Sequence, residues 1–568
     1  MSINLRWRQF ASWRRKNGLF CTIVSWIIIA IIVYTLLSAI WGYGHGWSRI
    51  LAGWHIGATH DPLDRIKVTL TALGGVGAVG YLVIKYRERA ALERGEADEK
   101  LVRAVQQLGD ASPQVRIAGV YALADVADTY EGPYHQRVVD ILCGYLRTDR
   151  LLKDANGDTR YATNDDGTPN YDQPLSADGA VESTILFVLT NHLHLSGKYN
   201  NPEENNTGSW SHCYLDLHNA CITETVIFKN VYIGDINASG ARFSKNIAFL
   251  ECVFTQAASF RGAEFTQDAN FRHTTFGWTT SFDDANFKGD ADFQGTTFGL
   301  ANFVGTTFGG VANFGAKLTQ KGAHFELEAN FQDTTFMKDA NFGARIVGPQ
   351  SNGSIFEDSA HFNGCTFKSR AIFQGTAFKR DANFGSGIWS SIGSIWLGEG
   401  TAFKGPALFR HATFETGNFQ GAVFEGCADF REAKFAQDAK FGGNPLTENT
   451  TIFLQRADFE TTHFAQEADF VGDTHSGGTT FKMDALFRRA TFSKTPNFRN
   501  VHFNMMLIST DRIAFPLELR QGNGLPEGAR WVNFEDKNSN ASADGCCQDS
   551  PEKPPLPLDN AENIKDSN

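Results

Sequence analysis

The stretch that decides the fold runs Ala269-Asn270-Phe271-Arg272-His273-Thr274-Thr275-Phe276, and variants of it recur over about half of the chain. Between Phe249 and Phe298, phenylalanine returns at alternating steps of five and six residues, so the repeating unit has eleven residues. The chain has 47 phenylalanines in 568 residues, and 41 of them lie between Phe243 and Phe503. A fixed period of this kind indicates a repeat architecture rather than a mixture of ordinary globular domains.

The positions around each Phe predict how the repeat folds. A small residue, usually Ala or Thr, stands two positions before the Phe, and a polar residue such as Asn or Asp stands between them. This order places two side chains inward and one outward, as in a very short strand. A corner every five or six residues suits a tightly wound solenoid, in which successive coils pair at about 4.8 Å and Phe stacks on Phe. Four steps predict a coil of about 22 residues and about twelve coils in all.

This pattern resembles the pentapeptide-repeat family, whose unit reads Ala-(Asp/Asn)-(Leu/Phe)-x-x. The resemblance implies a right-handed quadrilateral β-helix over residues 213–505, with the Phe and the preceding small residue filling its interior. The chain departs from the family unit in the sixth residue of alternate steps, and we expect that residue to bulge at alternate corners. The helical segments 101–109 and 115–123, and Trp531 near the end, are similar to those of membrane-anchored bacterial members.

Two apolar runs near the N-terminus predict a transmembrane helical hairpin. Residues 1–18 are basic, and residues 19–41 carry no charge, so as a helix they reach about 34 Å, enough to cross a membrane core of about 30 Å. Residues 68–84 reach only about 26 Å and form a marginal span. Lys and Arg are richer outside these runs than in the short external loop 42–67, so we expect both termini in the cytoplasm and two spans in the cell membrane. If the second span failed to insert, the C-terminal part would lie outside.

Residues 85–200 predict a helical stalk and a helical cap before the solenoid. Ser112 is the expected N-cap of one helix, and further helices are expected over 135–147 and 180–193. The polar residues 154–176 between them carry an Asp154-Asn156-Asp158 spacing that resembles a calcium loop. The glycine is misplaced and no Glu stands at the twelfth position, so we expect a surface loop without a metal.

Five interruptions break the repeat, and each follows an Ala-x-Phe unit: 315–324, 343–355, 385–402, 442–452 and 471–480. The number of Phe steps between breaks is even, so the interruptions should leave the coil at one edge or the opposite one. The longest is too apolar for an idle loop. We expect it either to form a partner-binding protrusion or to pack back onto the coil. Its candidate residues are Ile388, Trp389, Ile392, Ile395, Trp396 and Leu397.

The end of the chain predicts a C-terminal cap over 506–535 and a disordered tail over 536–568, which is rich in Asn, Asp, Ser, Pro and Lys. Without a cap the last coil would expose Phe and strand edges. A homodimer through this end of the solenoid is one way to cover them.

No motif in the sequence predicts catalysis, a cofactor or a metal. Gly75–Gly80 spells the glycine pattern of dinucleotide sites, but no second parallel strand follows it. The nine cysteines form no C-x-x-C pair and no Cys/His cluster at zinc spacing. The histidines of the repeat do not recur as ladders, and His45, His55 and His60 fit an interfacial segment better than a metal site. We therefore expect the protein not to be an enzyme.

The net charge and its distribution distinguish between the remaining functional hypotheses. The net charge of −11, with no dominant basic stripe, argues against direct binding of nucleic acid. The leading hypothesis is a membrane-tethered, non-enzymatic scaffold or protein-binding module that faces the cytoplasm. The family resemblance implies an alternative, a DNA mimic that protects topoisomerase. Residues 243–503 hold 27 Asp and Glu against 23 Lys and Arg, a net charge of −4, which is weak for such a mimic.

Overall fold

The structure is a computed structural model that describes residues 28, 32, 62–194, 208–316, 321–344, 353–391, 394–444, 447, 449–471, 478–507 and 512–532. For residues 62–73, 76–77, 387–391 and 394–398 it gives the course of the backbone alone. The chain divides into two units, Met1–Val102 and Arg103–Asn568.

One long helix, α4 (Pro62–Leu108), holds both the second apolar run and the charged stalk. The Gly75–Gly80 pattern lies inside this helix, so it does not form the strand and turn of a dinucleotide site. Of the first apolar run, 19–41, only Ile28 and Ile32 belong to the described residues, and both are helical. Within the described ranges, no helix combines the length and the apolar character needed to cross a membrane.

Three helices follow at the positions expected from the sequence: α5 (Pro113–Tyr130), α6 (Pro133–Leu146) and α7 (Gly179–Leu193). Ser112 occupies the N-cap of α5, but its side chain does not cap the helix and lies 2.7 Å from Gln114 Oε1 instead. Val120, Leu142 and Leu189, one from each helix, are fully buried. The three helices therefore form a small core of their own.

The expected surface loop 154–176 is in part a β-hairpin. It contains two antiparallel strands, β1 (Tyr161–Thr163) and β2 (Pro169–Pro174). Arg242 donates a hydrogen bond to the Tyr171 carbonyl at 2.6 Å, and Lys288 pairs with Asp172. Arg242 is 71 positions from Tyr171 in the sequence, and Lys288 is 116 positions from Asp172, so the local sequence could not reveal either contact.

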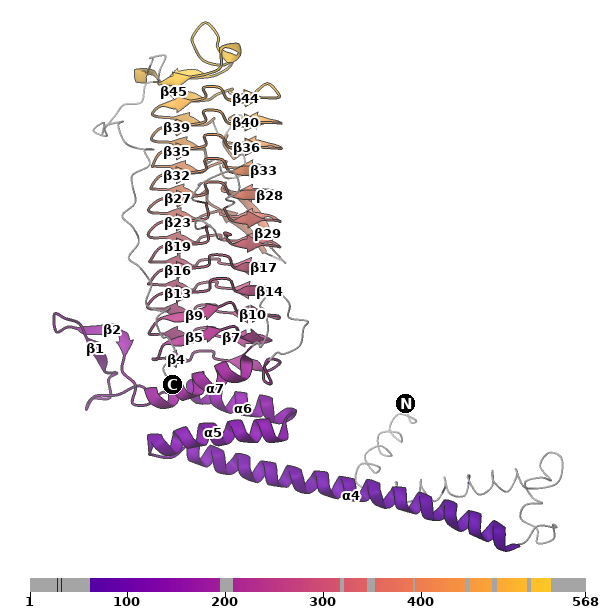
Figure 1. Ribbon diagram of the computed structural model, residues 1–568. Helices are drawn as coiled ribbons and strands as arrows, with labels where there is room; N and C mark the ends of the chain where they lie inside the picture. The colour runs from indigo at the N-terminus through magenta and orange to yellow at the C-terminus, as the bar shows by residue number, and fades with distance from the viewer. Residues whose placement is uncertain are drawn as a thin grey trace, which may run out of the picture. The chain divides into compact units, whose positions relative to one another are not determined.

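The solenoid runs from β3 (Tyr214–Asp216) to β47 (Arg530–Val532) as stacked parallel strands, which Figure 1 shows between β5 (Val226–Lys229) and β45 (His502–Asn504). The strands form sheets of 18, 13 and 12 strands. The 18-stranded sheet covers two sides of the coil, because strands such as β14 (Thr275–Ser281) pass around a corner. Three sheets therefore supply the four sides that the family resemblance implies.

One coil illustrates the register. Strand β12 (Glu264–Phe265) belongs to the 13-stranded sheet, β13 (Ala269–Asn270) to the 12-stranded sheet and β14 to the 18-stranded sheet. The next coil places Phe287 over Phe265, 22 residues on, and the one after places Phe308 over Phe287, 21 residues on. The expected coil length of about 22 residues is confirmed.

The coil continues past the expected boundary at residue 505. Strand β46 (Ile513–Ala514) pairs with β43 (Ala485–Leu486), and β47 pairs with β45. The ring of Phe515 stacks on Phe487 at 4.8 Å. The described residues of the expected C-terminal cap therefore form a last coil. Its residues do not follow the five- and six-residue Phe period, so that period did not predict this coil. The tail 536–568 lies outside the described residues.

Phenylalanine ladders fill the interior, as predicted. Phe271 and Phe293 are fully buried and stack at 4.9 Å with their planes 2° apart. Across the coil, Phe271 meets Phe282 edge-on at 5.4 Å and 78°. Stacking along the axis and edge-on contact between sides are both favourable aromatic geometries, so a single residue type can fill the whole core.

Candidate interaction surface

The corners of the coil are of two kinds, and they alternate. Two residues after every second Phe of the regular coils, the backbone adopts a positive φ, for example 56° at His273 and 67° at Gly295. A hydrogen bond of 3.2 Å from the Thr274 N–H to the Phe271 carbonyl closes this turn. The positive values recur at every eleventh residue: Gly240, Glu251, Gly262, His273, Asp284 and Gly295. These tight corners belong to the five-residue steps, so the sixth residue lies at the other corners.

Two polar positions of the repeat have structural roles that the sequence pattern did not predict. Asn270 Oδ1 accepts the Arg272 N–H at 3.1 Å, which shapes the entry to the tight corner. Just past the corner, the buried Thr274 hydroxyl donates to the Phe249 carbonyl of the previous coil at 2.6 Å. Thr296 repeats this bond to the Phe271 carbonyl at 2.7 Å. A hydroxyl or thiol two residues before the next Phe, as at Ser354 and Cys365, is the sequence signal of this role.

All five interruptions replace tight corners, and they leave the coil at two edges, as predicted. The first two separate strands of the 12-stranded sheet from strands of the 18-stranded sheet: β19 (Ala312–Asn313) from β20 (His324–Phe325) and β23 (Ala340–Asn341) from β24 (Ile355–Phe356). The other three separate the 18-stranded sheet from the 13-stranded sheet: β28 (Ala377–Asn383) from β31 (Ala402–Phe403), β37 (Ala439–Lys440) from β38 (Ile452–Phe453) and β41 (Ala468–Asp469) from β42 (Thr480–Phe481). We call this second edge the insertion corner.

The longest interruption, on the insertion corner, is a β-hairpin. Strands β29 (Gly387–Ser391) and β30 (Ser394–Gly398) pair antiparallel, with Ile388 opposite Leu397, Trp389 opposite Trp396, and Ser390 opposite Ile395. Ile392 lies outside the described residues. The backbone therefore brings five of the six candidate residues into one two-stranded sheet. Whether that hairpin binds a partner or packs back onto the coil stays a prediction.

The stem of the hairpin is held by buried polar side chains. Asn383 Oδ1 accepts the Gly385 N–H at 3.0 Å, and the Asn363 amide donates to the Gly385 carbonyl. On the next residue, the Ser386 N–H donates to the Gln420 carbonyl at 2.7 Å. Asn363 and Ser386 are each 1% exposed. Successive coils thus fix the point at which the hairpin leaves the coil.

The next interruption reinforces the same stem. The Asn444 amide donates to the Ser386 carbonyl, and the Ser386 hydroxyl lies 2.7 Å from the Thr447 hydroxyl. Gln420 Nε2 donates to the Gly443 carbonyl at 3.1 Å. The bases of the third and fourth interruptions therefore form one continuous surface along the insertion corner, although 58 residues separate Ser386 from Asn444.

Charges on the outside of the coil pair between neighbouring coils. Lys288 lies 2.7 Å from Glu264, and Lys379 lies 2.8 Å from Glu357. Hydrogen bonds from Lys379 and His324 lower the pKa of Glu357. Both signs of charge thus alternate along the axis, which weakens any long-range field.

The helical cap is joined to the first coil by a buried ion pair. Glu182 of α7 is fully buried, and its carboxylate accepts the Thr223 and Glu224 N–H groups at 2.6 and 2.8 Å. Arg150 pairs with Glu182 and also donates to the Cys221 carbonyl at 2.8 Å. The sequence does not reveal this contact, because Glu182 resembles an ordinary acidic residue in the first turn of a helix.

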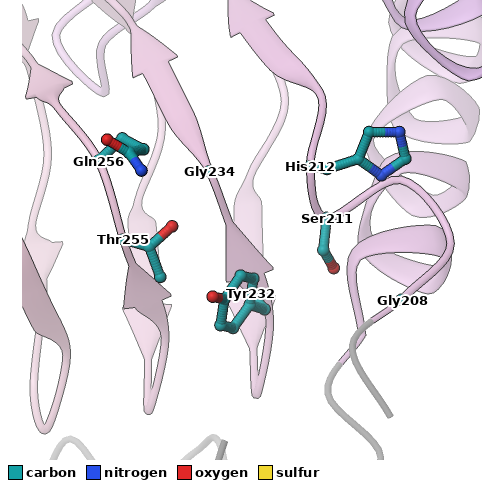
Figure 2. Close-up of a pocket in the computed structure, with 7 residues that line it drawn as sticks. All are labelled: Gly208, Ser211, His212, Tyr232, Gly234, Thr255 and Gln256. Carbon is teal, nitrogen blue, oxygen red and sulfur yellow. The ribbon is translucent and has the colours of Figure 1, made fainter. Parts of the chain in front are cut away.

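The N-terminal end of the solenoid, over two neighbouring coils, carries a cavity of about 380 Å³. Its lining has no acidic or basic residue other than a histidine: Gly208, Ser211, His212, Tyr232, Gly234, Thr255 and Gln256. Figure 2 shows the His212 ring turned away from Tyr232, and that ring lies 5.5 Å from the His135 ring. Among the described residues, no group of three or more His, Cys, Asp or Glu side chains is placed to hold a metal ion.

The described cysteines are free thiols, five of them buried. Burial raises the pKa of Cys143 and of Cys252 to about 12, so neither thiol ionises readily near neutral pH.

Part of the repeat matches the model of a known protein family. Residues 238–280, 249–297, 271–316 and 399–443 match the family model of pentapeptide repeats (9 copies). No curated protein and no solved structure matches the chain. The matched residues carry the eleven-residue unit and the Phe ladders described above, so the resemblance is confirmed. Residues 238–316 and 399–443 therefore belong to the pentapeptide-repeat family.

Proposed function

We propose that this protein is a non-enzymatic scaffold whose insertion corner binds a protein partner. The observation that carries the proposal is the clamped stem of the β29–β30 hairpin. An idle loop needs no such support, whereas a fixed stem reduces the conformational freedom that the hairpin would lose on binding. The hairpin sequence contains two Trp and three Ile residues and no charged residue, a composition suited to the centre of an interface.

We further propose that residues 19–41 and 68–84 anchor the scaffold in the cell membrane, with both termini and the coil in the cytoplasm. The basic residues that flank these runs support this orientation. Labelling of an exposed coil position tests it: Asp381→Cys, in a background with Cys21, Cys546 and Cys547 replaced by serine. We expect an impermeant thiol reagent to label this site only after the cells are permeabilised. Labelling of intact cells contradicts the orientation.

The paired surface charges favour the scaffold over a DNA mimic, which needs a continuous negative stripe. On this coil, acidic residues such as Glu264 and Glu357 lie within 2.8 Å of lysines from neighbouring coils. We therefore do not propose a topoisomerase-protecting role.

Cross-linking and affinity capture from membranes test the binding surface. The full chain is compared with a variant in which two glycines replace residues 387–398, because Gly387 and Gly398 pair at the base of the hairpin. The matched control replaces residues 345–352, from the interruption that separates β23 from β24 at the opposite edge, in the same way. We expect the hairpin variant to lose a cross-linked partner that the control retains. Identical partner sets for all three chains would overturn the proposal.

A further inference from the structure

The β29–β30 hairpin presents two strand edges without partners. It forms a sheet of its own with only these two strands, so within the described ranges each strand has one unpaired side. Two-stranded sheets are at best marginally stable in water, and a third or fourth strand stabilises them strongly. The clamped stem therefore supports an incomplete sheet.

The edges also lack the usual protection against pairing. Natural edge strands commonly carry lysine, proline, inward charges or a bulge. Residues 387–398 contain no charged residue and no proline, and the register of β29 with β30 is unbroken from Gly387 to Gly398. Such an edge is a template for another strand.

We propose that β30 pairs antiparallel with β30 of a second copy of this chain, giving a four-stranded sheet. This inference rests on the proposed function, because it names the occupant of the same surface. A two-fold axis at Trp396 places Trp396 opposite the partner subunit's Trp396. It also places Ile395 opposite the partner subunit's Leu397, so the three central positions of the seam are all apolar.

The alternative edge is less complementary. Pairing through β29 about Trp389 would place Ile388 opposite the partner subunit's Ser390. Pairing through β30 instead extends the Trp389–Trp396 register pair into a row of four tryptophans across the sheet. Because the contact is isologous, it closes on itself and predicts a dimer rather than a fibre.

Disulfide trapping tests the register in the full-length protein in detergent, with Cys21, Cys546 and Cys547 replaced by serine. Residues opposite each other across an antiparallel seam have Cα atoms about 4.5–5.5 Å apart, which suits a disulfide. We expect Trp396→Cys to form an intermolecular disulfide under mild oxidation. Trp389→Cys is the matched control, and it should not cross-link because two further strands separate the copies at that position.

Replacing Trp396 removes a side chain from the proposed seam and can itself weaken the dimer. A second pair of cysteine variants therefore leaves both tryptophans in place. Ser394→Cys mixed with Gly398→Cys should give a heterodimeric disulfide, because the proposed register places these residues opposite each other. The molar mass of the unlabelled protein should be that of a dimer, and that of a monomer once residues 387–398 are replaced. A dimer that survives the replacement, equal trapping at 389 and 396, or a monomeric wild type overturns the inference. If a foreign partner is still lost with the hairpin, the proposed function stands without it.

Discussion

The regular coils and the attachments to them are held together in different ways. Each coil repeats the same contacts: Phe on Phe, a threonine hydroxyl on a Phe carbonyl, and an Asn or Asp side chain on the following turn. The attachments depend on single contacts between distant residues, such as Glu182 with Thr223 or Arg242 with Tyr171. A repeated contact leaves a periodic signal in the sequence, whereas a single long-range contact leaves none.

The largest effects should come from cutting a ladder. Phe331 is fully buried and stacks on Phe303 and Phe362 at 4.8 and 5.0 Å. Phe331→Ala should cost about 3–5 kcal/mol of the free energy of unfolding, because it opens a cavity between two coils. Chemical denaturation measures the loss. Leu327→Ala, at a position 49% exposed, is the control and should change stability little; equal effects would contradict the ladder as the main support.

A comparable loss, confined to one end, is expected at the cap. Glu182→Ala leaves Arg150 buried without its carboxylate and removes the acceptor for two backbone N–H groups, which should cost about 3–5 kcal/mol locally. Amide hydrogen exchange should rise at residues 221–229 and stay unchanged around Phe331. Uniform exchange along the coil would show that cap and coil are not held separately.

A smaller effect tests the hydroxyl ladder. Thr296→Val keeps the shape of the side chain but removes one of the two hydrogen bonds that the buried Phe271 carbonyl accepts, the other coming from the Thr274 N–H, which should cost about 1–3 kcal/mol. The outward neighbour Thr297→Val should cost much less, and thermal unfolding of the two variants measures the difference. Equal losses would mean that the buried hydroxyl is incidental.

The smallest structural effect is expected at a tight corner. Gly295 has φ 67°, and an added Cβ would lie 2.4 Å from His273 Nδ1. Gly295→Ala should therefore cost about 1–2 kcal/mol. In the double variant His273→Gly, Gly295→Ala, the clash disappears and part of that stability should return. If no stability returned, the whole loss in Gly295→Ala would come from backbone strain at residue 295 and not from the clash with His273.

The same contrast explains how much of the molecule could be predicted. The Phe period and the small residue before each Phe predicted the coil, its length and the two edges for the interruptions. These signals did not predict β1–β2, which Arg242 and Lys288 hold from distant coils. They also did not predict the last coil, where Ile513 stands in register with Ala485 and Trp531 with Phe503. The hairpin was expected only as an apolar loop, and its clamp was missed because Asn363, Ser386 and Asn444 meet only in the folded chain.

The central claim is that the insertion corner is the contact surface, and site-specific photocross-linking tests it most directly. A photoreactive amino acid is placed at Glu399, which is exposed beside the hairpin, or at Glu432, which is exposed at the opposite edge. Cells expressing the full chain are then irradiated. We predict protein adducts at position 399 and none at position 432. Equal adducts at both positions, or adducts at 432 alone, would contradict the assignment of this corner as the binding surface.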